Sequence, residues 1–438
     1  MTDIIFSFDT EDFTSSVAAD AVYREAEVLR EAGVKGGFCI VGLLADQLVK
    51  WGRNDVLDAL KHHEIGTHSY GHSLHPTINE YTDLEDFDKA YNELIRQETE
   101  AVEMIKKATD GRVMTVACPP GNQKSYVAMY GYADMGIPVY ADTFCDTEDG
   151  RGVFYCNIYQ VKYTFALEKL LTKNSDEEIS EILDFLATKK RAVIFTHPNM
   201  ANFTEFWDKL NYYKTNIAEY GNWKECNRRP VEDTENFYKN IGKFINRIKN
   251  DSRFRITDYA ELANEIKAEG ERKITKADIP ALRDTISTEF SSVTQPCSLC
   301  ISDMFLACRD FLAGKSEHIC GKVYGFMDTP YAVENEVVLD AEDIIKSAYD
   351  IDAERFLPAS ITVGNVKIGP ADWLRAAMAV LCGEKKAVVK PAPQLPDLSV
   401  LPDLTDDCCK GWVQSDDFKD EYLSKRLKLQ AWTMRFMK

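Results

Sequence analysis

Two short segments in the first part of the chain carry side chains that could bind a metal ion and activate water. Residues 6–13 (FSFDTEDF) place Asp9, Glu11 and Asp12 where an apolar run ends, and residues 67–72 (THSYGH) place His68 and His72 four positions apart. Two imidazole nitrogens and a carboxylate oxygen suit zinc, with cobalt or nickel as alternatives. A further carboxylate beside the ion could take a proton from water. The two segments therefore predict metal-assisted hydrolysis.

Each of these groups also has a simpler interpretation. On a helical turn His68 and His72 would point to the same side, but they could equally be polar loop residues. Strand alternation directs Asp9 and Glu11 to one side and Asp12 to the other. The same acidic residues could instead form a solvated turn or cap the next helix.

A third histidine stands at the end of another apolar run. Residues 192–196 (AVIFT) predict a strand, and His197 follows it directly, before Pro198. A single imidazole at a strand tip is well placed to act as a general acid, although a buried structural histidine would fit the same pattern.

The elements that must position these residues alternate between strands and helices over residues 1–270. We predict strands at 4–8, 35–41, 64–67, 113–117, 138–141, 155–159, 192–196 and 254–257. We predict helices at 20–31, 86–107, 176–188, 237–249 and 259–267. This alternation is typical of a parallel α/β fold. Asp9, His68, Pro119 and His197 each follow a different strand, and barrel enzymes build their sites at those strand ends.

Four motifs in this order resemble those of the NodB-type polysaccharide deacetylases, carbohydrate esterase family 4, over residues 3–262. Residues 7–12 (SFDTED) resemble the first motif, T-F-D-D-G, in a D-x-E variant, and residues 68–72 (HSYGH) match the second, H-[ST]-x-x-H. Residues 117–122 (ACPPGN) stand where the third motif, R-x-P-x-[FY], is expected, and residues 194–197 (IFTH) resemble the motif L-x-H.

The resemblance implies a deformed (β/α)7 barrel that hydrolyses the N-acetyl group of a carbohydrate such as chitin or peptidoglycan. By analogy, Asp9 would be the general base and His197 the general acid, while Glu11, His68 and His72 would hold the metal. A related amide or cyclic-amide hydrolase on the same barrel is one alternative. A catalytically silent carbohydrate-binding protein is another.

The chain also departs from the family pattern. Cys118 replaces the third-motif arginine that orients the base. A backbone N–H in the stretch from Cys118 through Pro120 to Gly121 would, together with the metal, stabilise the oxyanion. With no D-x-x-D-W motif present, Asp142 is the first candidate to orient His197, and Asp146 is the next.

A long insertion rich in aromatic residues follows His197 at residues 199–233. Long ordered loops at a barrel mouth are often binding loops. We expect Trp207 and Trp223, together with Tyr70, to contact the sugar; the alternative is that the two tryptophans pack the core of the insertion itself.

The rest of the chain differs in character. Residues 271–385 predict a smaller, mainly helical module with short strands, in which residues 303–314 resemble residues 372–383 as a two-fold internal repeat, unless the match is chance. Residues 357–364 and the following helix resemble pseudomurein-binding repeats, which implies contact with cell-wall polysaccharide. Residues 386–438 predict a proline-rich linker and a C-terminal tail.

Composition excludes several classes of partner. The net charge of −19 disfavours nucleic acids and anionic membranes, and no apolar run is long enough to span a bilayer. The N-terminus enters a strand without a basic segment or an apolar leader, so we expect a cytoplasmic protein unless a leader has been removed.

Overall fold

The computed structural model describes residues 1–142, 147, 149–213, 217–399 and 414–437. The chain divides into two compact units. The first comprises the described residues of Met1–Gly152, Ile158–Ile266 and Thr405–Leu423, and the second those of Val153–Asn157, Lys267–Leu404 and Ser424–Lys438.

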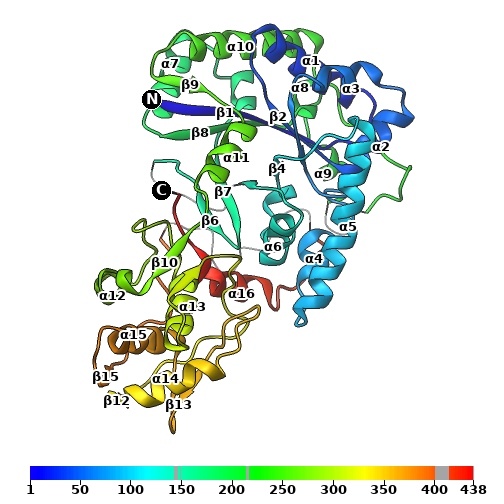
Figure 1. Cartoon of the computed structure of the whole chain (residues 1–438). Helices are drawn as coiled ribbons and strands as arrows, with labels where there is room; N and C mark the ends of the chain where they lie inside the picture. Colours follow the sequence, from blue (N-terminus) through cyan, green and yellow to red (C-terminus); the bar gives the residue numbers. More distant parts are fainter. Residues whose placement is uncertain (143–146, 148, 214–216, 400–413, 438) are drawn as a thin grey trace. The chain divides into compact units, whose positions relative to one another are not determined.

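The first unit is a closed barrel of seven parallel strands, as the sequence predicted. The strands follow one another in the order β2–β3–β4–β5–β7–β8–β1, and β1 pairs with β2 to close the ring. Of these strands, β1, β2, β4, β7 and β8 are labelled in Figure 1. Their bounds are β1 (Thr2–Thr10), β2 (Gly37–Ile40), β3 (Glu64–Thr67), β4 (Val116–Ala117), β5 (Val139–Asp142), β7 (Ile158–Ala166) and β8 (Arg191–Thr196). A further parallel strand, β9 (Phe254–Ile256), pairs with the start of β1. Because all seven strands run the same way, their carboxyl ends share one mouth.

Helices connect these strands, and their apolar faces cover the barrel. The long α5 begins after Asp86, whose side chain accepts a hydrogen bond from the Lys89 N–H, and buries Leu94 and Ile105 at helical spacing. The helices of this unit are α1 (Ala18–Glu31), α2 (Gly42–Lys50), α3 (Asn54–Leu60), α4 (Ile78–Thr82), α5 (Phe87–Ala108), α6 (Tyr126–Asp134), α7 (Asp176–Leu186), α8 (Asn199–Asn202), α9 (Trp207–Asn211), α10 (Val231–Lys249) and α11 (Tyr259–Ala268), with the 3-10 turns η1 (Pro120–Asn122) and η2 (Leu167–Leu171).

Two differences from the predicted elements matter for the site. The strand expected at 155–159 is instead a separate strand, β6 (Val153–Tyr155), followed by the nine-residue β7. The segment after β3 is a loop rather than a helical turn, because Ser69 and His72 both take positive φ values of 69° and 52°. The structure therefore brings His68 and His72 together by a tight loop and not by helical spacing.

In its described part, the second unit contains five α-helices and short antiparallel strands. The first four helices are α12 (Ile279–Thr288), α13 (Ile301–Leu312), α14 (Ala341–Asp350) and α15 (Pro370–Leu381), with β10 (Lys273–Thr275) paired to β11 (Glu317–Ile319), β12 (Val337–Asp340) to β15 (Lys386–Val389), and β13 (Ile361–Val363) to β14 (Val366–Ile368). The 3-10 turns η3 (Lys276–Asp278) and η4 (Gln430–Thr433) and the C-terminal α16 (Leu423–Leu429) complete the set.

The two segments that resemble each other have matching local structure. Asp303 accepts the Cys300 N–H at the start of α13, and Asp372 accepts the Gly369 N–H at the start of α15, both at 3.1 Å. The glycines that close the two segments, Gly314 and Gly383, share a φ of 97°.

Parts of the expected linker and tail also belong to this unit. Residues 386–389 form β15 because they pair with β12. Trp432 is fully buried in the core of the unit, where its ring packs on Phe326 at 4.8 Å. Among the described residues of the whole chain, no helix is long and apolar enough to cross a membrane.

Candidate active site

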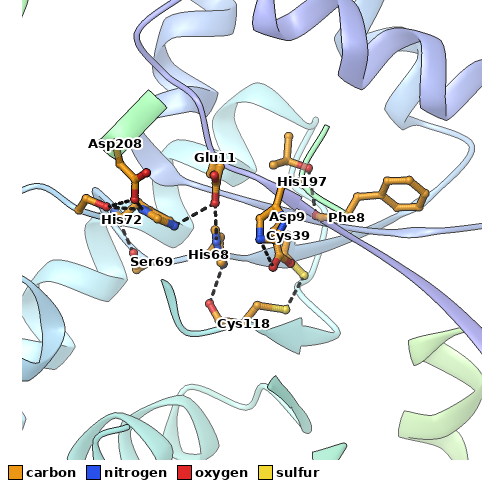
Figure 2. A network of polar contacts seen from close by, with 12 residues as sticks. Phe8, Asp9, Glu11, Cys39, His68, Ser69, His72, Cys118, His197 and Asp208 are labelled. Atoms are coloured by element: carbon orange, nitrogen blue, oxygen red, sulfur yellow. Dashed lines mark hydrogen bonds and ion pairs between the residues drawn. The ribbon is translucent and has the colours of Figure 1, made fainter. Parts of the chain in front are cut away.

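Three predicted ligands converge at the mouth of the barrel. The Nε2 atom of His72 lies 2.9 Å from Glu11 Oε2, and that of His68 lies 3.4 Å from the same oxygen (Figure 2). All three side chains are buried, and each offers one ligand atom within 4.8 Å of the others. Glu11 follows β1 and His68 follows β3, so the barrel mouth brings them together although they are distant in sequence.

Both histidines hold their other ring nitrogen away from Glu11. His68 Nδ1 lies 2.9 Å from the carbonyl oxygen of Cys118, and His72 Nδ1 lies 2.6 Å from Ser73 Oγ. A carbonyl oxygen can only accept, so His68 carries a proton on Nδ1, and the neutral ring presents its lone pair on Nε2. The buried Nε2 of His68 has no hydrogen-bond partner among the described residues. This donor set of two nitrogens and one oxygen fits a divalent cation.

The carboxylate in this group is held in its charged form. Burial opposes ionisation of Glu11, but the neighbouring His72 and His68 outweigh it and hold the pKa of Glu11 well below its usual value. Glu11 is thus an anion at neutral pH, as a metal ligand must be.

Asp9, the predicted base, has a partner that the sequence analysis did not identify. The Tyr163 hydroxyl on β7 donates a hydrogen bond of 2.6 Å to Asp9 Oδ1. Cys118 lies beside this pair, and its thiol donates to Cys39 Sγ at 2.9 Å. Burial raises the pKa of the Cys118 thiol well above its usual value, so Cys118 brings no charge to Asp9. Asp9 is therefore bonded to a tyrosine hydroxyl at the place where the resemblance led us to expect an arginine.

His197, the predicted acid, also has an unexpected partner. Its Nδ1 donates to Glu168 Oε1 at 2.8 Å, and its backbone N–H donates to the same oxygen at 2.7 Å. Burial favours the neutral ring, but Glu168, and more weakly Glu11 and Asp9, raise the pKa of His197 to about 10. The carboxylate bonded to His197 Nδ1 is therefore Glu168, whereas Asp142 was the residue expected to orient this ring. Asp146 lies outside the described residues.

The Nε2 side of the His197 ring faces Asp9, the predicted base. His197 Nε2 lies 3.7 Å from Asp9 Oδ2, so a charged imidazolium faces a carboxylate beside the group of metal ligands. This distance leaves both groups within reach of one reacting amide.

These residues line one cavity of about 290 Å3. Besides the ligands, base and acid, its walls are formed by Pro119, Gly121, Asp142, Tyr163, Phe195, Phe206 and Asp208. Of the secondary candidates, Asp142 and Gly121 line this cavity. Cys118 and Pro120 are buried beside it, and Tyr70 lines a neighbouring pocket with Tyr81 and Arg96.

The two tryptophans of the insertion do not line the cavity. Trp207 is fully buried, and its indole N–H donates to Glu11 Oε1 at 3.0 Å. Trp223 donates to the Tyr212 hydroxyl at 2.8 Å and packs its ring against Phe13 at 5.5 Å. The alternative interpretation, in which these side chains pack the core around the insertion, describes them better than contact with a sugar.

Asp12 belongs to the turn after β1. Its Oδ1 accepts both the N–H and the hydroxyl of Thr14, at 2.9 and 2.6 Å. Burial raises the pKa of Asp12 to about 7 against these hydrogen bonds.

No family model matches the sequence, and no curated protein matches it. Among solved structures, the chain is similar to a family 4 carbohydrate esterase from Streptomyces lividans in complex with acetate, at 12% identity and a TM-score of 0.32, covering 58% of this chain and 90% of that one. It is similar to a peptidoglycan deacetylase from Bacillus subtilis, at 12% identity and a TM-score of 0.33, covering 65% and 96%. It is also similar to a CE4 family pseudoenzyme from Bacillus anthracis, at 14% identity and a TM-score of 0.36, covering 60% and 65%. The family that the motifs resemble is thus represented among the matches, at low similarity.

Proposed function

We propose that this protein is a metal-dependent hydrolase that removes an N-acetyl group from a saccharide of the chitin or peptidoglycan kind. The observation that supports this most is the grouping of a buried Glu11–His68–His72 set with a carboxylate, Asp9, and a charged imidazole, His197, around one cavity. These are the parts that water attack on an amide needs.

Glu11, His68 and His72 would hold the cation, with zinc the first expectation. When bound, the ion would polarise the amide carbonyl and lower the pKa of water towards ~7. Asp9, fixed by Tyr163, takes the proton of the attacking water. His197, kept charged by Glu168, gives its proton to the leaving amine nitrogen. The backbone at Gly121, on the cavity wall, is the candidate contact for the carbonyl oxygen.

The shape and lining of the cavity also suit a second candidate function. Its aromatic and apolar walls at Phe195, Phe206 and Pro119 enclose about 290 Å3, which suits a small amide or cyclic amide as well as one sugar residue.

One experiment separates these candidates from a silent binding protein. Zinc-loaded protein is incubated with chitooligosaccharides, peptidoglycan fragments and a panel of small and cyclic amides, and acetate or amine release is measured. The proposal expects acetate release from an acetylated sugar and its loss in Asp9→Asn and His197→Gln. Turnover of small amides alone would select the second candidate. Zinc binding without any turnover would contradict both.

A further inference from the structure

Two consecutive residues of the insertion each contact a different candidate metal ligand. Both lie on the short α9, Trp207 at its start and Asp208 next to it. Trp207 contacts Glu11, and Asp208 reaches His72 through Ser73. Figure 2 shows Asp208 on the far side of His72 from Glu11.

Trp207 decides which oxygen of Glu11 faces the histidines. Its indole N–H donates to Oε1 at 3.0 Å, while Oε2 faces both His68 and His72. The indole nitrogen is a donor only and cannot ligate a cation itself. The contact therefore fixes the Glu11 carboxylate so that Oε1 is hydrogen-bonded to Trp207 and Oε2 is directed at the candidate metal site.

Asp208 fixes the ring of His72 through a serine hydroxyl. Ser73 Oγ donates its one proton to Asp208 Oδ2 at 2.8 Å. The lone pairs of Ser73 Oγ are then left to accept from His72 Nδ1, which lies 2.6 Å away. With its proton on Nδ1, His72 presents the lone pair of Nε2 towards Glu11 and His68. The carboxylate thereby selects the ring form that can ligate a metal.

The position of α9 is itself well fixed. Trp207 is fully buried and packs its ring against Phe13 at 4.7 Å and against His72 at 5.5 Å. Asn211, also buried, donates to the carbonyl oxygens of Trp207 and Lys224, each at 3.0 Å. A short helix held in this way can act as a rigid support.

We propose that Trp207 and Asp208 are positioning residues of the metal centre, and that the insertion serves to support Glu11 and His72 from behind. This inference rests on the metal site of the proposed function. It assigns the two side chains to metal affinity and coordination geometry, and not to contact with the substrate.

The test measures metal affinity and does not depend on turnover. Metal-free protein is titrated with zinc in competition with a chromophoric chelator, and with cobalt to record the visible absorption of the bound ion. Trp207→Phe removes the N–H and keeps an aromatic ring. Asp208→Asn removes the charge that fixes the direction of the Ser73 hydroxyl, and Ser73→Ala removes that hydroxyl. Each variant is expected to bind zinc about 10–100-fold more weakly and to shift the cobalt spectrum. Trp223→Phe, a tryptophan of the same insertion that bonds to Tyr212, is the matched control and should change neither.

The double variant Ser73→Ala, Asp208→Asn separates positioning from a general loss of structure. If Asp208 acts through Ser73, the double variant loses no more affinity than the more severe single variant. Independent, additive losses would overturn the proposed hydrogen-bond chain, and wild-type affinity in Trp207→Phe and Asp208→Asn would overturn the inference as a whole. Should Trp207→Phe fail to fold, Ser73→Ala still tests it, because it removes one oxygen atom and leaves α9 untouched. An unmodified protein that binds no zinc would instead contradict the proposed function, together with this inference.

Discussion

Replacing Glu168 with glutamine should lower the pKa of His197 without moving the ring. Glutamine keeps a side-chain oxygen that can accept from both the Nδ1 and the backbone N–H of His197, so the change removes mainly the charge. Only 23% of the His197 side chain and 17% of the Glu168 side chain are exposed, so water screens the pair weakly. A hydrogen bond to a charged group is worth about 1–2 kcal/mol more than a neutral one, and 1.36 kcal/mol corresponds to one pKa unit, so we expect the pKa to fall by roughly 0.7–1.5 units from about 10.

The assay is an NMR titration of the His197 ring in metal-free protein, with Glu177→Gln on the exposed face of α7 as a control that should leave the titration unchanged.

The pH dependence of the free energy of unfolding gives an independent measurement. Because the folded pKa lies above the ordinary 6.5, protonation of His197 stabilises the folded state; this contribution is complete below about pH 6.5 and is lost as the pH rises through about 10. Glu168→Gln should therefore flatten the alkaline loss of stability. A His197 pKa that moved by less than about half a unit would refute the role given to Glu168.

Three further predictions concern the base, the barrel wall and the metal. Tyr163→Phe removes the hydrogen bond to Asp9 and should lower kcat/KM by about 100-fold, as expected for a misplaced base, while zinc affinity stays unchanged. Gly66→Ala should destabilise the protein by about 1–3 kcal/mol in urea unfolding, because a Cβ there would lie 2.7 Å from the Val116 carbonyl oxygen; Gly242→Ala, whose Cβ would meet nothing closer than 3.9 Å, is the control and should lose no stability. Zinc at 100 times its dissociation constant should stabilise the fold by about 2.7 kcal/mol, seen as a higher Tm that a chelator reverses, and His68→Ala should lose this gain.

The position of the main site residues could be predicted because strand ends are easy to recognise in a parallel barrel. The apolar runs within β1 and β8 end in polar residues at the carboxyl end of each strand, and β3 ends directly before His68. Closing the barrel then brings Asp9, His68 and His197 to the same mouth without any knowledge of the loops. The structure places His72 beside His68 and Glu11, but through two positive φ angles and not through the helical turn on which the prediction rested.

The supporting residues could not be predicted because irregular backbone places them. The register of β7 against β8 shifts between Tyr163 and Phe165, and such an irregularity redirects side chains in a way that alternation does not show. Glu168 lies in the 3-10 turn after that strand, and Asp208 lies in a five-residue helix within the insertion. No spacing in the sequence links these residues to His197 or His72. The polar alternation of residues 158–166 was the one available signal, and it indicates a strand without indicating a hydroxyl aimed at Asp9.

The charges around the cavity explain how a chain without the family arginine can still build this site. The acidic side chains of Asp9, Glu11, Asp142 and Asp208 line the cavity, and Glu168 bonds to the one imidazolium, His197, so acidic groups outnumber that cation in a largely buried region. An arginine at position 118 would offset one of them, but Cys118 is neutral and Tyr163 donates to Asp9 without adding charge. A divalent cation held by Glu11, His68 and His72 would offset part of that acidity. The cysteine therefore makes the proposed site more dependent on its metal than a site with the arginine would be, because buried charge needs a partner of opposite sign.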